Sequence, residues 1–261
     1  MKQQKDKTFV ITATLSQKDI EATYQKVILS VQSNFETKGF RKGKAPLNIV
    51  KENVSEAKII EEVLTNLISK VYSDEIEKNH LHPVIQPQIK VLNPPVALGK
   101  DWEIEITGCE LPEIILDEKY IDVIKKVNKS KDNDNSKLTA TMDALVANSK
   151  VELPEILIKA DIENKLSQLV DQTQQAGLTI QQYLKSRNQT LEQYQEILKT
   201  QVQNEWITNL AIDKISKDNE LTISDLEANE LVKKSPQFAK NMNLVYYLLT
   251  QQKVFDFLKK L

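Results

Sequence analysis

The sequence predicts an α+β N-terminal module, a small antiparallel sheet with helices, followed by an elongated all-α C-terminal domain. Three observations carry this prediction. Apolar and polar residues alternate over 9–15 and 102–107, which is the two-residue period of half-buried strands. From residue 138 onward, apolar residues recur at helical spacings of three and four. A charged, Asn-rich segment without apolar periodicity separates the two parts.

The first module, residues 1–127, opens with the strand over 9–15. Ser16 follows as a candidate N-cap, and Asp19 at the third helical position makes a weak capping box. The helix that they begin is predicted to reach Val31.

Two further helices and three further strands complete this module. Pro46 suits the first position of a short helix, and Ser55 can begin a longer helix through Ile76. Strand patterns then return, so we expect the helices to cover one face of the sheet. The three strand segments are residues 83–92, 102–109 and 120–127.

Residues 128–137 are interpreted as a linker, and residues 138–261 as a domain without strands. Pro154 opens one helix of this domain, and Gly177 lies at its C′ position. The last helix, from Ser235 to Leu261, is apolar nearly all round, so it must be buried or meet a partner. Three other helices begin at the cap pairs Thr179 with Gln182, Thr190 with Gln193, and Ser224 with Glu227.

Composition narrows the class of protein. The 261 residues are 40% hydrophobic and 28% charged, with a net charge of −2. General nucleic-acid binders are usually basic, so any contact with a polyanion must be local. Cys109 is the only cysteine, which excludes an intramolecular disulfide. No apolar run resembles a signal peptide or a membrane span, so we expect a soluble cytoplasmic protein with no membrane partner.

The segment GFRKGKAP, Gly39–Pro46, is the most informative stretch. A phosphate-binding P-loop would need Ser or Thr after the lysine, but Ala45 follows Lys44, so this interpretation is rejected. The simplest alternative is a solvated turn, since glycine permits positive φ and lysine keeps a loop soluble. Phe40 argues against it, because an exposed ring gains free energy only when a partner buries it.

Magnitudes favour a docking loop. Burial of the Phe40 ring is worth about 1.5–3 kcal/mol, whereas an exposed ion pair from Arg41 adds about 0.2–1 kcal/mol. Phe40 should therefore supply most of the contact free energy. The cations would select an acidic or phosphate-bearing surface and speed the encounter.

This loop resembles the GFRxGxxP-type signature of the trigger factor family, bacterial ribosome-associated chaperones. Gly39, Phe40, Arg41, Gly43 and Pro46 match the signature. The resemblance covers nearly the whole chain in order: WEIEITGCELPEI resembles the family's ribosome-binding domain. VELPEILIKADIENKL, GLTIQQYL and the helix running to NELTISDLE resemble its helical chaperone domain.

The resemblance implies an ATP-independent chaperone that docks at the exit tunnel of the large ribosomal subunit and holds nascent polypeptides. Residues 1–127 would be the ribosome-binding domain and 138–261 the chaperone domain. Phe40, Arg41 and Lys42 would contact an acidic patch on a ribosomal protein, and Lys44 would reach nearby rRNA. The predicted ribosome-binding residues are Gly39, Phe40, Arg41, Lys42, Gly43, Lys44, Ala45 and Pro46.

The chain departs from the family at residues 128–137. Members of the family usually carry a peptidyl-prolyl isomerase domain at this place, and a short polar linker cannot form one. We therefore expect no enzymatic activity, no cofactor and no metal. On the last helix, Tyr246, Tyr247 and Phe255 are candidate client-binding residues, since tyrosine combines an apolar ring with a polar tip. A homodimer of the free protein is a further possible partner state.

Other interpretations stay open at this point. One is an RNA-binding or ribosome-assembly factor that uses the basic loop, against which the acidic overall charge counts. Another is a free or dimeric chaperone similar in shape to periplasmic helical chaperones. His80 and His82 lack a third metal ligand nearby in the sequence, and Cys109 lacks a CxxC partner.

Overall fold

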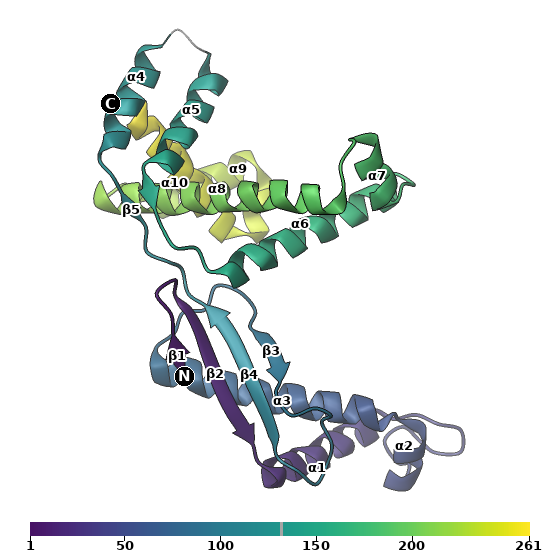
Figure 1. The fold of residues 1–261 in the computed structure, drawn as a ribbon. Coiled ribbons are helices and arrows are strands. Elements are labelled where there is room, and N and C mark those ends of the chain that lie inside the picture. Colours follow the sequence, from purple (N-terminus) through teal and green to yellow (C-terminus); the bar gives the residue numbers. More distant parts are fainter. Residues whose placement is uncertain (131–132) are drawn as a thin grey trace. The chain divides into compact units, whose positions relative to one another are not determined.

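The protein is described by a computed structural model, which covers residues 1–130 and 133–261 (Figure 1). The chain forms two compact units, Met1–Leu111 and Pro112–Leu261. Each unit has its own hydrophobic core, so each is described by itself.

A four-stranded antiparallel sheet forms the first unit together with three helices. The strands lie in the order β1–β2–β4–β3, and β2 and β4 pair along their whole length with Ile11 opposite Ile106. The strands are β1 (Lys2–Gln3), β2 (Thr8–Leu15), β3 (Gln88–Val91) and β4 (Trp102–Cys109). The helices are α1 (Gln17–Asn34), α2 (Leu47–Asn53) and α3 (Glu56–Asn79).

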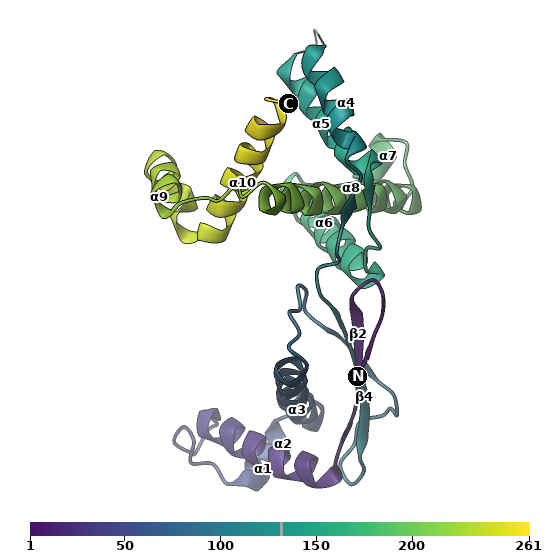
Figure 2. The same cartoon turned by 90° about the vertical axis from the view of Figure 1, so that its left-hand side faces the viewer.

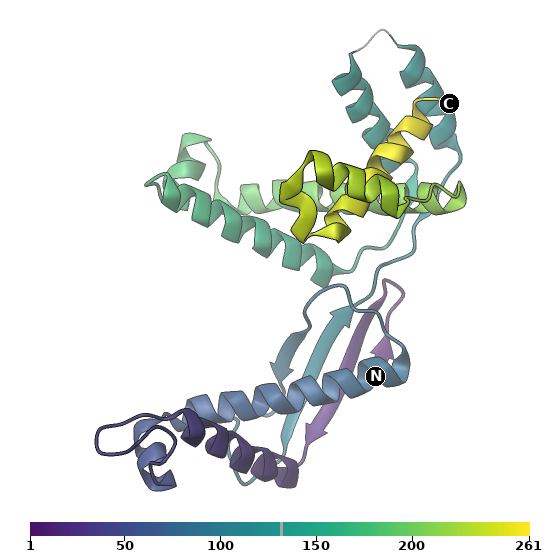
Figure 3. The same ribbon diagram turned by 180° about the vertical axis from the view of Figure 1, so that it is seen from behind.

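The helices α1 and α3 cover one face of this sheet, as predicted (Figures 2 and 3). The alternation in β2 and β4 places every second side chain on that face, where Phe9, Ile104 and Trp102 are fully buried. The Trp102 indole N–H is also satisfied, because it donates to the Ala97 carbonyl at 2.8 Å. The opposite face carries polar residues such as the exposed Glu103.

The second unit is mainly helical, with one short pair of strands. Its core gathers Ile124, Leu145, Ala211 and Leu258 from four different helices. The helices are α4 (Lys119–Lys129), α5 (Asp134–Ala147), α6 (Glu155–Gln175), α7 (Ile180–Ser186), α8 (Leu191–Asp218), α9 (Asp225–Lys234), the 3₁₀ helix η1 (Pro236–Lys240) and α10 (Met242–Leu258). The strands are β5 (Ile115–Leu116) and β6 (Ser149–Lys150).

Most predicted helix starts are confirmed. The Ser16 side chain accepts from the Asp19 N–H at the start of α1. Complete capping boxes begin α7, α8 and α9, each with two reciprocal side-chain hydrogen bonds. Short polar motifs thus fixed these boundaries, because they satisfy the free N–H groups of a first turn locally.

Three secondary-structure predictions are wrong. Residues 120–127 form most of helix α4 rather than a strand, and Tyr120 and Ile124 meet the core at the helical spacing of four. The second unit is not free of strands, since β5 pairs with β6. The last α-helix begins at Met242, because η1 intervenes and Asn241 caps α10 by accepting from the Leu244 N–H.

The division between the units also differs from the predicted boundary at residue 127. The first unit ends at Leu111, and α4 belongs to the second unit because its apolar side is buried there. The predicted linker 128–137 is largely helical: its start completes α4, and its end begins α5 at Asp134. Residues 131–132 of the predicted linker lie outside the described residues.

Within the part of the chain that the structure describes, no helix combines the length and the apolar content needed to cross a lipid bilayer.

Candidate functional sites

The loop between α1 and α2 is held at both ends by hydrogen bonds. The Gly43 N–H donates to the Phe35 carbonyl at 3.0 Å, next to the C-terminus of α1. On the other side, the Gln32 side chain donates to the Ala45 carbonyl at 2.8 Å. Ala45 is only 1% exposed. The two hydrogen bonds therefore fix the ends of the loop, and the middle of the loop projects between them.

Glycine is required at one of these two hydrogen-bonded ends. Gly43 has a φ of +73°, and a Cβ atom built there would lie 2.7 Å from the Ser33 carbonyl oxygen. Real Cβ atoms do not approach a backbone oxygen so closely, and positive φ itself disfavours other residues. The second glycine of the motif thus allows the loop to turn against the end of α1.

The tip of the loop presents an aromatic ring and cations to solvent. The Phe40 side chain is 42% exposed, and Arg41, Lys42 and Lys44 are exposed as well. Among the described residues, no carboxylate forms an ion pair with any of these three cations. The ring and the three cations are thus exposed, whereas the Ala45 side chain, which was also predicted to bind the ribosome, is buried within the unit.

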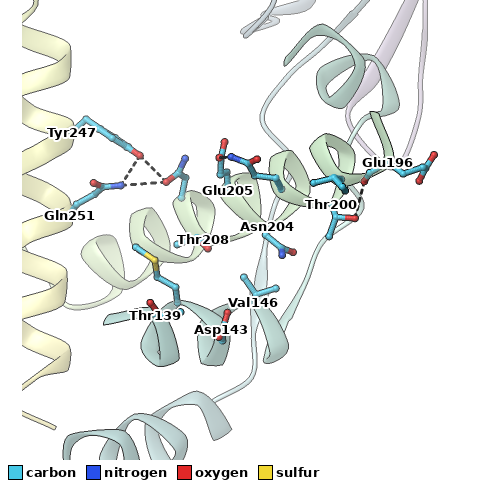
Figure 4. Close-up of a pocket in the computed structure, with 14 residues that line it drawn as sticks. Thr139, Asp143, Val146, Glu196, Thr200, Asn204, Glu205, Thr208, Tyr247 and Gln251 are labelled. Carbon is cyan, nitrogen blue, oxygen red and sulfur yellow. Dashed lines mark hydrogen bonds between the residues drawn. The ribbon is translucent and has the colours of Figure 1, made fainter. Parts of the chain in front are cut away.

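A second candidate site is an open groove between α5, α8 and α10. It has a volume of about 890 Å³. In Figure 4, Thr139, Asp143 and Val146 on α5 lie across from Asn204 and Thr208 on α8, and α10 contributes Tyr247 and Gln251. The apolar contribution comes from Met142, Val146, Ile197 and Tyr247.

A hydrogen-bond network fixes the α10 side of this groove. The Tyr247 hydroxyl donates to the Asn209 side-chain oxygen at 2.8 Å, and the Gln251 amide donates to the Tyr247 hydroxyl at 2.6 Å (Figure 4). Burial raises the pKa of the Tyr247 phenol above its ordinary value; the hydrogen bond with Asn209 opposes this shift, and Glu205 adds to it. Two side chains thus hydrogen-bond the hydroxyl, and the residue as a whole is 43% exposed.

The charged side chains among the described lining residues of the groove are all acidic. Asp143, Glu196 and Glu205 line it, and none of its described lining residues is a cation. Lys165 pairs with Glu205 at 3.0 Å from outside the lining, which offsets one of the three carboxylates. The groove thus combines apolar side chains, amides and hydroxyls with a net negative charge.

The structure separates the three predicted client-binding residues. Only Tyr247 lines the groove. The Tyr246 hydroxyl donates to Asp225 on α9 at 2.6 Å, and this hydrogen bond raises the pKa of the phenol. Phe255 packs against the core of the second unit. Sequence reasoning missed the groove residues of α5 and α8, although Ile197 gave a signal: it is an isoleucine outside the buried stripe of α8 and is 49% exposed.

The remaining sequence candidates show no assembled reactive group. His80 ends α3 in the left-handed conformation. Burial raises the pKa of the Cys109 thiol to about 11, with a smaller effect from Asp6, so the thiolate is scarce at neutral pH. Within the described residues, no three His, Cys, Asp or Glu side chains gather as a metal-binding group.

The fold and the two sites define a class: an α+β unit with a glycine-bounded loop, joined to a helical unit with an open groove. Two family models match this chain, "Bacterial trigger factor protein (TF)" over residues 1–145 and "Bacterial trigger factor protein (TF) C-terminus" over residues 113–260. The chain belongs to the bacterial trigger factor family.

Relatives and a solved structure agree with this assignment. The chain is 29% identical over 153 residues to trigger factor of Streptococcus mutans, which covers 58% of this chain and 34% of the relative. It is 31% identical over 155 residues to trigger factor of Clostridium perfringens, covering 59% of this chain and 35% of the relative. The matched part thus spans about a third of the length of these relatives.

The fold has a counterpart among solved structures. A structure from work on promiscuous substrate recognition by the trigger factor chaperone superposes with a TM-score of 0.61 and 10% sequence identity. The superposition covers 99% of this chain and 98% of the other. At this identity the likeness concerns the fold, and it supports the α+β and helical architecture of the two units.

Proposed function

We propose that this protein is an ATP-independent, cytoplasmic chaperone that docks on the ribosome near the nascent-chain exit and holds emerging polypeptides. The observation that carries the proposal is the exposed Phe40 ring, flanked by cations without ion pairs among the described residues. It lies in the loop that carries the family signature, in a chain of the trigger factor family. The family favours this function over that of an RNA-binding or ribosome-assembly factor.

In this proposal the Phe40 ring supplies most of the binding free energy, and the cations select and attract an acidic partner surface. Burying Phe40 against a partner is worth about 1.5–3 kcal/mol. Arg41 and Lys42 attract an acidic patch on a ribosomal protein and speed the encounter. Lys44 contacts adjacent rRNA phosphate. Gly43 and Ala45 act indirectly by holding the loop against α1.

Ribosome co-sedimentation tests this part of the proposal. Phe40→Ala should weaken binding about 10-fold to 100-fold, as expected from the loss of about 1.5–3 kcal/mol, and the Phe40/Arg41/Lys42→Ala variant should weaken it further. A matched control is Leu29/Lys18/Lys26→Ala, which removes an exposed apolar side chain and two exposed cations from α1. Equal binding of the docking variant and the wild type would contradict the proposal.

The groove between α5, α8 and α10 is the proposed client site. Its apolar side chains offer weak, nondirectional contacts, and its amides and hydroxyls can pair with the backbone of an unfolded segment. Its carboxylates favour apolar segments that carry Lys or Arg. Release needs no hydrolysis, because a client that folds buries its own apolar surface.

Suppression of aggregation of an unfolded client tests the groove. Ile197→Asp should lower protection several-fold, because it places a charge on the apolar part of the groove. Leu226→Asp is the matched control, since Leu226 is 77% exposed on α9 and does not line the groove. Equal effects of the two variants would exclude a specific role for the groove.

Two finer points belong to the same proposal. We expect no prolyl isomerase activity, and a proline-limited refolding assay should show no rate above the uncatalysed background. A homodimer of the free protein is the remaining candidate partner state, and sedimentation analysis over a concentration series would detect it.

A further inference from the structure

Exposed lysines lie on α4 and directly after α10, two helices that a hydrogen bond joins at the end of α10. We call this set the lysine cluster; its members are Lys125, Lys126, Lys129, Lys259 and Lys260, all of them exposed. In Figure 1 the C-terminus lies beside α4, so the residues that follow α10 lie next to this helix.

Hydrogen bonds hold this junction together. The Asn128 side chain, next to Lys129, donates to the Leu258 carbonyl at 2.9 Å. The Lys137 ammonium group, from the first turn of α5, donates to the Asn128 carbonyl at 3.1 Å. Asn128, Lys137 and Lys259 also line one small cavity of about 220 Å³. Lys137 of α5 and Lys259 after α10 thus lie at the same cavity as Asn128 of α4.

Three carboxylates lie near these five lysines, because Asp122 and Asp256 each precede a lysine pair by one helical turn and Asp134 lines the small cavity. Among the described residues, none forms an ion pair with any member of the lysine cluster. Asp134 lines the small cavity, and Asp122 lies on α4. Asp256 of α10 instead lines a different cavity together with Glu227 and Lys253. Lysines therefore outnumber carboxylates in this set by five to three, although the chain as a whole carries a net charge of −2.

Helix stability alone explains only part of this arrangement. Lysines at the C-terminus of a helix interact favourably with its dipole. That effect accounts for a lysine in the last turn of α4 or just beyond α10, each taken separately. It does not require the two helix ends to be joined through Asn128 with their lysines exposed and free of ion pairs among the described residues.

We propose that the lysine cluster binds the phosphate backbone of RNA, without reading its sequence, as an accessory contact of the second unit. Lysine is a compact charge on a flexible stem, which suits phosphates in varied positions. A membrane surface is a poorer fit, because Tyr120 and Ile124 turn the apolar side of α4 into the protein core rather than toward lipid. The proposed function supplies the RNA source, which is the ribosomal surface.

The test uses the whole chain and a labelled RNA hairpin of arbitrary sequence, titrated between 50 and 200 mM KCl. The five lysines of the cluster are replaced in Lys125/Lys126/Lys129/Lys259/Lys260→Gln. If three of them contact phosphates, the slope of log K against log salt should become shallower by about 2–3, and affinity at low salt should fall about 10-fold or more. The corresponding Lys→Arg variant should retain the wild-type affinity.

A matched control changes the net charge by the same amount elsewhere in the second unit. It replaces Lys185, Lys199, Lys233, Lys234 and Lys240 with Gln, all of them exposed and outside the lysine cluster. The control should keep most of the affinity. An equal loss in both variants would overturn the proposal in favour of nonspecific attraction. A lowered melting temperature without a loss of RNA affinity would overturn it in favour of helix stabilisation.

Two further arms separate this inference from other partners and from the proposed function. Tighter binding to phosphatidylserine vesicles than to RNA at equal salt would overturn the RNA assignment. The Phe40/Arg41/Lys42→Ala variant tests docking separately. Suppose that this variant no longer binds ribosomes, while the cluster variant still shows the expected loss of RNA affinity. The inference then stands for RNA in general, and the ribosome is rejected as the source of that RNA. If docking is intact and the cluster variant binds RNA normally, only this inference fails.

Discussion

Gly43 couples the conformation of the docking loop to the end of α1. Gly43→Ala should destabilise the first unit by about 1–3 kcal/mol, because a left-handed residue gains a Cβ against the Ser33 carbonyl. Gly39→Ala is the control, since Gly39 also has positive φ but has no atom within 4 Å of the built Cβ. Urea unfolding should show a larger loss in the free energy of unfolding for Gly43→Ala than for Gly39→Ala. Equal losses for the two variants would contradict a steric role for Ser33.

Cys109 illustrates a residue whose environment makes it inert. Its pKa, raised by burial to about 11 from 9.0, keeps the thiol protonated at neutral pH. A thiol reagent at pH 8 should therefore react much more slowly with the native protein than with the urea-unfolded chain. Equal rates would contradict the buried placement.

The same shift gives Cys109 a signature in stability. The folded state holds the proton more tightly than the unfolded state, so the free energy of unfolding should fall as pH rises from about 9 toward about 11. Cys109→Ala should remove this part of the pH dependence. If the difference in the free energy of unfolding between wild type and Cys109→Ala stays constant over this pH range, the prediction is refuted.

At the scale of elements, α9 is tied to α10 through its capping box. Glu227 accepts from the Ser224 N–H at 2.8 Å and pairs with Lys253 on α10 at 2.6 Å. These contacts, with the Lys253 hydrogen bond the largest effect, lower the pKa of Glu227 from 4.5 to about 2. One carboxylate thus starts a helix and attaches it to its neighbour.

This carboxylate makes an acid-sensitive contribution to stability. Because its folded pKa is depressed, the contribution is present above about pH 4.5 and is lost as pH falls toward about 2. Glu227→Gln should be less stable than wild type at pH 7 and should approach it near pH 2 in urea titrations. Glu230→Gln, on the same helix, is the control and should show no such convergence.

Helix α4 is the element that sequence reasoning misassigned. The β-branched residues between 121 and 127 suggested a strand, because such residues are enriched in strands. Local propensity therefore does not identify this segment as a helix. The positions that enter the core, Tyr120 and Ile124, are four apart and fit a helix. Packing against α5 and against core residues of α8 and α10 decided the conformation, and the residues of α8 and α10 lie far away in the sequence.

At the scale of the whole molecule, the two cores predict two independently folding parts. Fragments 1–111 and 112–261 should each unfold cooperatively, as judged by circular dichroism during heating. Fragment 138–261, cut at the boundary that the sequence suggested, should be unstable, because it lacks the buried Tyr120 and Ile124 and the strand β5. A cooperative transition of 138–261 as stable as that of 112–261 would show that α4 is dispensable.

The candidate sites divide in the same way between sequence and structure. The proposed docking loop is suggested by eight consecutive residues, because a glycine-bounded turn that carries an aromatic ring is a local property. The groove could not be found in this way, since its lining comes from three helices. Of the three residues predicted on α10, Tyr247 reaches the groove, whereas Tyr246 and Phe255 face other neighbours.

The sequence by itself determined the caps of α7, α8 and α9, the alternation of β2 and β4, and the place of the glycine-bounded loop that we propose for docking. Each of these follows from residues close together in the chain, whose hydrogen bonds or periodicity act locally. Only the tertiary structure decided that residues 120–127 are helical, that the first unit ends at Leu111, and that a hydrogen bond joins α4 to the end of α10. The free energy that selects these features comes from burial and hydrogen bonds between distant segments, which local propensity does not encode.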